Sequence, residues 1–210
     1  TLWNRSSSTI SKLMRTRLIY CTGVISGQIP IYSVTNDISI ALENPDIILI
    51  TTPANSHRGL AELIAKNIRK STFIVLNPGR TFGALEFANI YKKYNNKYDQ
   101  IIAETQTIIY TCRKTDEDAV NIFALKDSVL ISSLDTDRII DYMPNCIKGF
   151  FKPAQSMIQT SIGNVGMVLH CAPLLLNAGW TESNKSIYKY YYDGITPTIG
   201  AFIEKLDMER

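Results

Sequence analysis

His170 is one of two histidines in the chain and stands in the segment "GNVGMVLHCAP", residues 163–173, among small and apolar residues. Imidazole titrates near neutral pH, so a histidine can accept and donate protons during an enzyme reaction. A histidine in an apolar helix is also often a core residue that hydrogen-bonds to a backbone carbonyl. Taken alone, the residue types leave both interpretations open.

Two further segments have the pattern of buried parallel strands that end in small or polar residues. "DIILITTP" (46–53) contains a continuous apolar run and stops at Pro53, and "STFIVLNPG" (71–79) repeats the design. Doubly wound folds bind ligands at the carboxyl ends of such strands. The candidate contacts are Pro53, Ala54 and His57 after the first strand, and Asn77, Pro78 and Gly79 after the second. His57 fits a surface residue of a first helical turn equally well.

Helices and strands alternate in the first part of the chain, which predicts an α/β fold around a parallel sheet up to about residue 145. The pattern predicts helices at 57–70, with Ser56 as N-cap, and at 84–94, and a strand pair at 100–113 and 119–126. From about residue 146 the chain reads as helical. Pro153 opens and Pro173 ends one predicted helix, and Thr196 caps another.

The composition is that of a soluble globular protein: 210 residues, 45% hydrophobic and 20% charged. The 22 basic and 19 acidic residues are dispersed, so there is no basic stripe for nucleic acid. No apolar run approaches the ~20 residues that cross a bilayer. Four cysteines without a C-x-x-C pair argue against a metal site and favour reduced thiols in the cytoplasm. The N-glycosylation triplets at 4–6 and 184–186 mean little in a protein of the cytoplasm.

The two ends of the sequence lead us to expect a piece of a longer chain. "TLWNR" resembles the end of a strand, yet no strand with a G-x-G-x-x-G turn precedes it, and the last helix has no stop signal. The missing first strand is central in a doubly wound sheet, so we expect the remaining strands to flank an empty slot.

Six motifs, in order and with suitable spacing, resemble the opine dehydrogenases, the octopine/nopaline dehydrogenase family. They are "DIILITTPANSH", "LNPGRTFGALEF", "AETQTIIYTCR", "GNVGMVLHCAPLLLNAG", "YYYDGITPTIG" and "EKLDMER". The resemblance implies a Rossmann domain, a helical second domain and an active site between them. It also implies NAD(P)H-dependent condensation of an amino acid with a 2-oxo acid such as pyruvate. We assign residues 1–145 to the first domain and 146–210 to the start of the second.

The same resemblance implies roles for individual residues. His170 corresponds to the catalytic acid and base, which the family orients with an aspartate from helices that this sequence lacks. Glu104 and Thr105 correspond to contacts with the amino-acid and oxo-acid substrates. The segment around Pro53, Ala54 and His57 borders the dinucleotide, and Gly79 allows the backbone to approach the nicotinamide. No residue is assigned to a metal.

The segment Asn4-Arg5-Ser6 occupies the position where NAD-specific Rossmann folds carry an acidic residue. An arginine there can bind a 2′-phosphate through two hydrogen bonds. We therefore expect NADP(H), with NAD(H) as the alternative.

Two alternatives to an opine dehydrogenase remain at this point. One is a related reductase of 2-oxo or 2-hydroxy acids that uses no amine, and the other is a non-catalytic relic or a subunit that depends on a partner chain. The oligomeric state stays open, with a homodimer as one option.

Overall fold

A computed structural model describes residues 1–183 and 187–210 and divides the chain into two compact units, Thr1–Ser161 and Ile162–Arg210. The second glycosylation triplet, 184–186, lies outside the described residues. The first unit extends past the predicted boundary at residue 145, because a strand that the sequence did not reveal, β11 (Phe151–Pro153), pairs with β10 (Val129–Ser133).

The main sheet of the first unit has five strands in the order β11-β10-β7-β6-β5. Its parallel part consists of β5 (Ile47–Ile50), β6 (Phe73–Leu76) and β7 (Ile101–Thr105), whereas β10 runs antiparallel to β7. The predicted parallel α/β architecture is therefore present, with a mixed edge. All four residues of β6 are buried, as expected for a strand covered on both faces.

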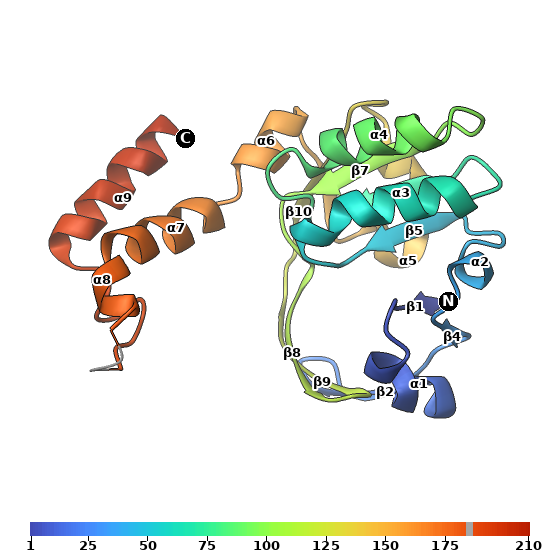
Figure 1. The fold of residues 1–210 in the computed structure, drawn as a ribbon, viewed down its shortest axis with the longest axis horizontal. Coiled ribbons are helices and arrows are strands. Elements are labelled where there is room, and N and C mark those ends of the chain that lie inside the picture. The colour runs from blue at the N-terminus through green and yellow to red at the C-terminus, as the bar shows by residue number, and fades with distance from the viewer. Residues whose placement is uncertain (184–186) are drawn as a thin grey trace. The chain divides into compact units, whose positions relative to one another are not determined.

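Helices α3 (His57–Asn67) and α4 (Gly83–Tyr94) lie side by side against the sheet (Figure 1). They bury an apolar stripe against β5, β6 and β7, and Phe87 at its centre is fully buried. The predicted cap at Ser56 is wrong: its hydroxyl donates to the carbonyl of Pro53 and caps no helical N–H. A 3-10 turn, η2 (Ala54–Ser56), leads into α3 and occupies the place of a side-chain cap.

The opposite face of the sheet has its own apolar cluster, which includes Val75, Ala103 and Ile131. It is covered by η3 (Ile139–Tyr142) and α5 (Asn145–Lys148), through residues such as Ile139. Layers on both faces make the central strands β6 and β7 the most deeply buried part of the unit.

A gap separates β5 from the short strand β1 (Leu2–Trp3), which pairs only with β4 (Val34–Thr35) within the described residues. A cavity of about 170 Å³ lies there, lined by residues of β1, β5, α3 and α2 (Ile38–Ala41). β5 is consequently an edge strand with Leu49 41% exposed, so its predicted burial on both faces is wrong. That a further strand would fill this cavity stays a prediction.

A second sheet has the order β3-β2-β9-β8. It is formed by β2 (Leu18–Gly23), β3 (Gly27–Pro30), β8 (Tyr110–Asp116) and β9 (Ala119–Leu125), and the β8-β9 hairpin reaches out from the main sheet to β2 (Figure 1). The prediction of one strand over 100–113 is wrong, because the chain leaves the main sheet after Thr105 and enters the second at Tyr110.

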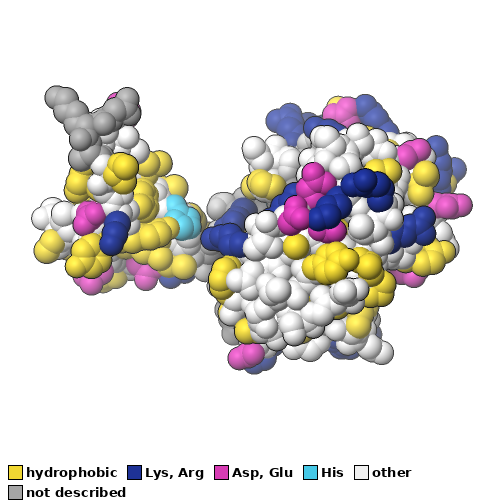
Figure 2. Space-filling view, turned by 90° about the horizontal axis from the view of Figure 1, so that it is seen from below, with side chains coloured by type: hydrophobic (Ala, Val, Ile, Leu, Met, Phe, Trp, Pro, Cys, Tyr) yellow, Lys and Arg dark blue, Asp and Glu magenta, His cyan; other side chains and the backbone are white. Residues whose placement is uncertain are grey.

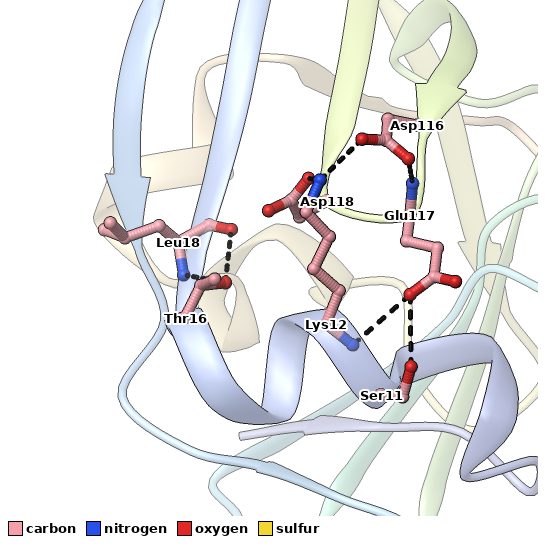
Figure 3. A network of polar contacts seen from close by, with 7 residues as sticks. All are labelled: Ser11, Lys12, Thr16, Leu18, Asp116, Glu117 and Asp118. Carbon is pink, nitrogen blue, oxygen red and sulfur yellow. Dashed lines mark hydrogen bonds and ion pairs between the residues drawn. The ribbon is translucent and has the colours of Figure 1, made fainter.

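An ionic network ties helix α1 (Ser11–Thr16) to the turn of that hairpin (Figure 3). Lys12 Nζ contacts Asp116 and, at 2.7 Å, Asp118, whose side chain is only 2% exposed. Glu117 accepts hydrogen bonds from the Ser11 hydroxyl and from the backbone N–H of Lys12. Hydrogen bonds to the two aspartates raise the pKa of Lys12 well above its usual range, which keeps it charged.

The segment into the second unit contains α6 (Met157–Ile162), and the unit itself contains α7 (Gly166–Leu176), α8 (Ala178–Thr181) and α9 (Pro197–Glu209). The predicted single helix between Pro153 and Pro173 is wrong at both ends. Pro153 closes β11, and Pro173 lies inside α7, where the last turn continues because the N–H of Asn177 bonds to the carbonyl of Pro173. The predicted cap at Thr196 is confirmed: its hydroxyl accepts from the N–H of Ile199.

Basic and acidic side chains are interspersed on the face of the molecule in Figure 2. Cys21, Cys112, Cys146 and Cys171 are all free thiols. Within the described part of the chain, no helix combines the length and apolar character needed to traverse a bilayer, and no three His, Cys, Asp or Glu side chains gather as metal ligands would.

Candidate functional site

Asn4, Arg5 and Ser6 follow β1 directly, and of the three only Arg5 lines the adjacent groove. Asn4 Oδ1 accepts from the N–H of Ser6 at 2.9 Å, which folds the segment into a tight turn. Arg5 is exposed and extends over α3, where its guanidinium would lie 3.6 Å from a Cβ at Gly59. The groove is also lined by Trp3, Asn36, Ile38, Glu62, Leu63 and Lys66.

Pro53, Ala54 and His57 follow β5, but they differ in exposure. Pro53 and Ala54 are exposed, whereas His57 is 1% exposed, so the alternative of a surface histidine is wrong. Its Nε2 lies 3.2 Å from the carbonyl of Thr52, which can only accept, so Nε2 carries the proton. Burial lowers the pKa of His57, which favours the neutral ring.

Asn77, Pro78 and Gly79 end β6, are buried, and contain a cis bond between Asn77 and Pro78. A Cβ at Gly79 would come within 2.3 Å of Glu104 Cβ. The close approach that requires glycine here is therefore the contact with Glu104 on β7. An approach of Gly79 to a nicotinamide stays a prediction.

Glu104 is fully buried at the end of β7, and both of its carboxylate oxygens are occupied. Oε2 accepts from the N–H of Ala84 at 2.9 Å, at the start of α4. Oε1 accepts from the hydroxyls of Thr160 (2.9 Å) and Ser161. Burial raises the pKa of Glu104, against the effect of these donors. Glu104 thus joins β7, α4 and α6.

Thr105 is also fully buried, and its hydroxyl lies 3.0 Å from both Asn77 Oδ1 and the carbonyl of Thr107. The predicted contacts of Glu104 and Thr105 with substrates find no support in this arrangement and stay predictions. What the two residues do in the structure is hold the end of β7 to the turn after β6.

Lys126 and Arg80 are cationic residues near this strand end that the sequence analysis did not single out. Lys126 Nζ donates to Thr107 Oγ1 at 2.6 Å. Burial lowers the pKa of Lys126, and the positive charge of Arg80 lowers it further. No motif marks either residue, so only the folded chain reveals that they are neighbours.

His170 lies on α7 and is exposed, which is the placement a proton-transfer group needs. Its Nδ1 lies 2.6 Å from the hydroxyl of Tyr191. Asp193, by contrast, accepts from the N–H of Lys189 at 2.7 Å and serves the turn around it. Tyr191 is therefore a neighbour of His170 that the sequence analysis did not single out.

Comparison with known proteins gives two matches in sequence. A sequence model described as "NAD/NADP octopine/nopaline dehydrogenase, alpha-helical domain" matches residues 153–210, which include His170. An opine dehydrogenase from Arthrobacter sp. (strain 1C) is 36% identical over 183 residues, or 84% of this chain. The chain belongs to the opine dehydrogenase family. It spans 49% of the length of that Arthrobacter relative.

Solved structures of two opine-forming dehydrogenases and of a ketopantoate reductase share the fold. Octopine dehydrogenase with NADH and L-arginine superposes with a TM-score of 0.68 over 94% of this chain and 52% of its own, at 15% identity. Yersinopine dehydrogenase with NADP+ gives 0.70 over 96% and 54%, at 13% identity. A ketopantoate reductase from Ralstonia eutropha JMP134 gives 0.59 at 11% identity over 96% and 61%. The expected Rossmann-type fold with a helical second part is confirmed.

Proposed function

We propose that the protein takes part in an NAD(P)H-dependent reductive condensation of an amino acid with a 2-oxo acid such as pyruvate. The observation that carries this proposal is the 36% identity with an opine dehydrogenase across 84% of the chain. The octopine dehydrogenase structures with L-arginine and with pyruvate support the same pair of substrate classes.

The first unit offers residues that fit a dinucleotide. Doubly wound folds bind dinucleotides at the carboxyl ends of parallel strands, and the turns after β1, β5 and β6 are at such ends. After β1 the chain carries Arg5, and the adjacent groove also holds Lys66, which forms an ion pair with Glu62 of the same groove. Asn4, Arg5 and Ser6 would hold the 2′-phosphate of NADP(H), and Pro53 and Ala54 are exposed at the next strand end.

The bound nicotinamide supplies the hydride, and His170 handles protons. We assign to His170 the removal of a proton from the substrate ammonium group, so that the amine can attack the carbonyl carbon of the oxo acid. The attack gives a carbinolamine once a proton has moved from its nitrogen to its oxygen. His170 then returns its own proton to this hydroxyl group, which leaves as water and yields the iminium that would accept the hydride. An exposed imidazole fits both transfers, because it is a base when neutral and an acid when protonated.

Turnover assays with the protein test this function directly. NADPH or NADH oxidation is followed with pyruvate alone, with each amino acid alone and with both, and the secondary amine is identified by mass spectrometry. We expect oxidation only with both substrates. Oxidation with an oxo acid alone would instead favour a simple reductase, and no turnover together with no change in nicotinamide fluorescence would favour a non-catalytic relic or a partner-dependent subunit.

A pair of neighbouring substitutions tests the role of His170. His170→Ala should abolish turnover and leave cofactor affinity nearly intact. Cys171→Ser, at the adjacent exposed residue, should keep turnover, because the proposed reaction gives that thiol no role. Retained turnover in His170→Ala would make His170 a structural residue.

We also propose that NADP(H) is preferred over NAD(H), on the basis of Arg5. Arg5→Asp places a carboxylate against the 2′-phosphate, so we expect weaker NADPH binding and a shift toward NADH. The matched control is Arg15→Asp, which makes the same change on an exposed face of α1 that does not line the groove. Affinities for NADPH and NADH are measured by fluorescence titration. If the Arg5 variant and the unchanged protein prefer NADPH over NADH to the same extent, Arg5 does not bind the 2′-phosphate.

Cellular location and assembly complete the proposal. The free cysteines favour the reducing cytoplasm, and cell fractionation with an antibody tests this. A homodimer is testable by sedimentation equilibrium, and a single species at the monomer mass would exclude it under the conditions used.

A further inference from the structure

Lys126 lies at the base of the β8-β9 hairpin, where the hairpin leaves the main sheet near the end of β7 (Figure 1). It follows β9 directly and is half-buried, and its backbone N–H donates to the carbonyl of Ile109 at 3.0 Å. Its ammonium group donates to Thr107 Oγ1 at 2.6 Å. The charge of Lys126 is therefore held against the segment that follows β7.

Arg80 reaches the same strand end from the turn after β6. The N–H of Gly79 donates to the carbonyl of Thr105 at 3.1 Å, which places the next residue, Arg80, beside the end of β7. Burial lowers the pKa of Lys126, and the positive charge of Arg80 lowers it further, as expected for two cations close together. Arg80 also has a φ of +62°, which is unfavourable for a residue with a side chain. Backbone strain of this kind is concentrated at ligand sites.

Neither charge has a carboxylate partner in the part of the chain that the structure describes. The ion pairs found there include neither Arg80 nor Lys126. Glu104, buried beside the same turn, uses both of its oxygens for donors on α4 and α6. Asp127, the residue after Lys126, is exposed and takes part in none of these ion pairs. Like charges without a counter-ion repel each other, and a bound anion would remove that repulsion.

A carboxylate group fits the donors at this strand end. An arginine guanidinium can bind a carboxylate through two parallel hydrogen bonds, and a lysine ammonium can add a third. Thr107 Oγ1 accepts from Lys126, so its own O–H can donate to the same ligand. Ligands of doubly wound folds bind at the carboxyl ends of the strands. Both substrates of the proposed reaction, the amino acid and the 2-oxo acid, carry a carboxylate.

We propose that Arg80, Thr107 and Lys126 bind the carboxylate group of a substrate at the carboxyl end of β7. This inference rests on the proposed function for the identity of the ligand, whereas binding itself is measurable without turnover. All three residues belong to the first unit. Because the site recognises a negative charge, an amide in place of the substrate carboxylate should give a poor substrate.

Nuclear magnetic resonance of the lysine side chains tests binding directly. In protein with 13C-labelled lysine, Lys126→Arg identifies the Cε signal of Lys126, because this variant keeps the charge but lacks the signal. Oxamate is the probe, since it has the shape and charge of pyruvate but its amide carbonyl forms no imine with an amine. We expect oxamate to shift the signal of Lys126 to saturation. The signal of Lys114, an exposed residue of β8, should not move.

Arg80→Gln tests whether the two cations act together. Removal of the guanidinium should raise the pKa of Lys126 and weaken oxamate binding by about tenfold or more. Arg113→Gln is the matched control, because it removes an exposed guanidinium from β8, and it should change neither quantity. An unchanged pKa of Lys126 in Arg80→Gln would overturn the inference. So would chloride, if at equal concentration it shifts the Lys126 signal as much as oxamate does.

Steady-state kinetics identify which carboxylate is bound. Lys126→Met should raise the KM of one substrate, pyruvate or the amino acid, by about tenfold or more, with the Kd of NADPH unchanged. Lys114→Met should alter none of these constants, and Lys126→Arg should retain part of the affinity. A weaker Kd for NADPH with unchanged KM values would assign the cations to a phosphate of the dinucleotide, and the inference would be wrong.

The two measurements separate this inference from the proposed function. Saturable oxamate binding at Lys126 in a protein that turns over no substrate pair would support the site and refute the function. Turnover with unchanged KM values in both Lys126→Met and Arg80→Gln would support the function and refute the site. Circular dichroism verifies that each variant is folded. If Lys126→Met does not fold, the oxamate titration of the unchanged protein still decides whether the site binds a carboxylate.

Discussion

Replacing Glu104 with glutamine tests whether burial or hydrogen bonding controls this carboxyl group. Glu104 is fully buried, and burial raises its pKa above the ordinary value of 4.5 despite three hydrogen-bond donors. Between the unfolded and the higher folded pKa, the folded protein binds more protons than the unfolded chain. The free energy of unfolding must therefore fall as the pH rises through this window, by about 1.4 kcal/mol for each unit of pKa difference.

Glutamine does not titrate, so the variant lacks this dependence on pH. It loses instead a fixed amount of stability, because its amide group fits the surrounding hydrogen-bond donors less well. Its amide oxygen can accept from the rigid N–H of Ala84, which leaves the NH2 group facing the hydroxyls of Thr160 and Ser161. Ser161 already accepts from the N–H of Phe82, so one hydrogen bond is weakened, at about 1 kcal/mol. We expect Glu104→Gln to have a lower free energy of unfolding than the unchanged protein in mild acid. This difference between the two proteins should become smaller as the pH rises.

Urea unfolding followed by circular dichroism at several pH values measures this effect. The difference in unfolding free energy, variant minus unchanged protein, should rise with pH above 4.5, since all other titrating groups are common to both. Glu62→Gln is the control, because Lys66 lowers the pKa of Glu62 and the difference there should not rise. A flat or falling difference for Glu104→Gln would mean that the donors outweigh burial, and the reasoning would be refuted.

Two further substitutions probe the packing around these elements. Gly79→Ala brings a Cβ within 2.3 Å of Glu104 Cβ, so we expect a loss of about 1–3 kcal/mol in urea unfolding, whereas Gly149→Ala, with nothing within 4 Å of its new Cβ, should be nearly neutral. Lys12→Met leaves the buried carboxylate of Asp118 without its cation, so its thermal midpoint should fall, and Lys12→Arg should restore part of the loss. Equal stability of the two glycine variants, or an unchanged midpoint in Lys12→Met, would contradict these packing arguments.

Local sequence signals were sufficient for the helices and strands whose pattern agrees with their burial. α3 and α4 present an apolar stripe at helical spacing, and α9 has its cap at Thr196. The errors arose where tertiary contacts decide. The chain over 100–113 is β-rich throughout, but pairing with two different sheets divides it, and Pro173 lies in a helix whose flanking hydrogen bonds continue past it.

The sequence indicated candidate residues for the site but not their contacts. The motif around His170 indicated a proton-transfer group, and the structure places that residue on an exposed part of α7. Tyr191 is 21 residues away in sequence, and nothing in a cluster of tyrosines shows which of them faces an imidazole. Such a contact becomes visible only when the turn before α9 folds back onto α7.

Glu104 and Thr105 illustrate a general ambiguity of polar residues at strand ends. At the carboxyl end of a parallel strand, a carboxylate and a hydroxyl have the chemistry of ligand contacts. A buried carboxylate, however, needs donors, and those at Glu104 come from Ala84, Thr160 and Ser161, up to 57 residues away. Because β7 lies inside the sheet, both side chains are buried. Their burial, rather than their residue type, therefore determines that they form hydrogen bonds within the protein. Polar residues at the end of a central strand are then better interpreted as links between elements until their exposure is known.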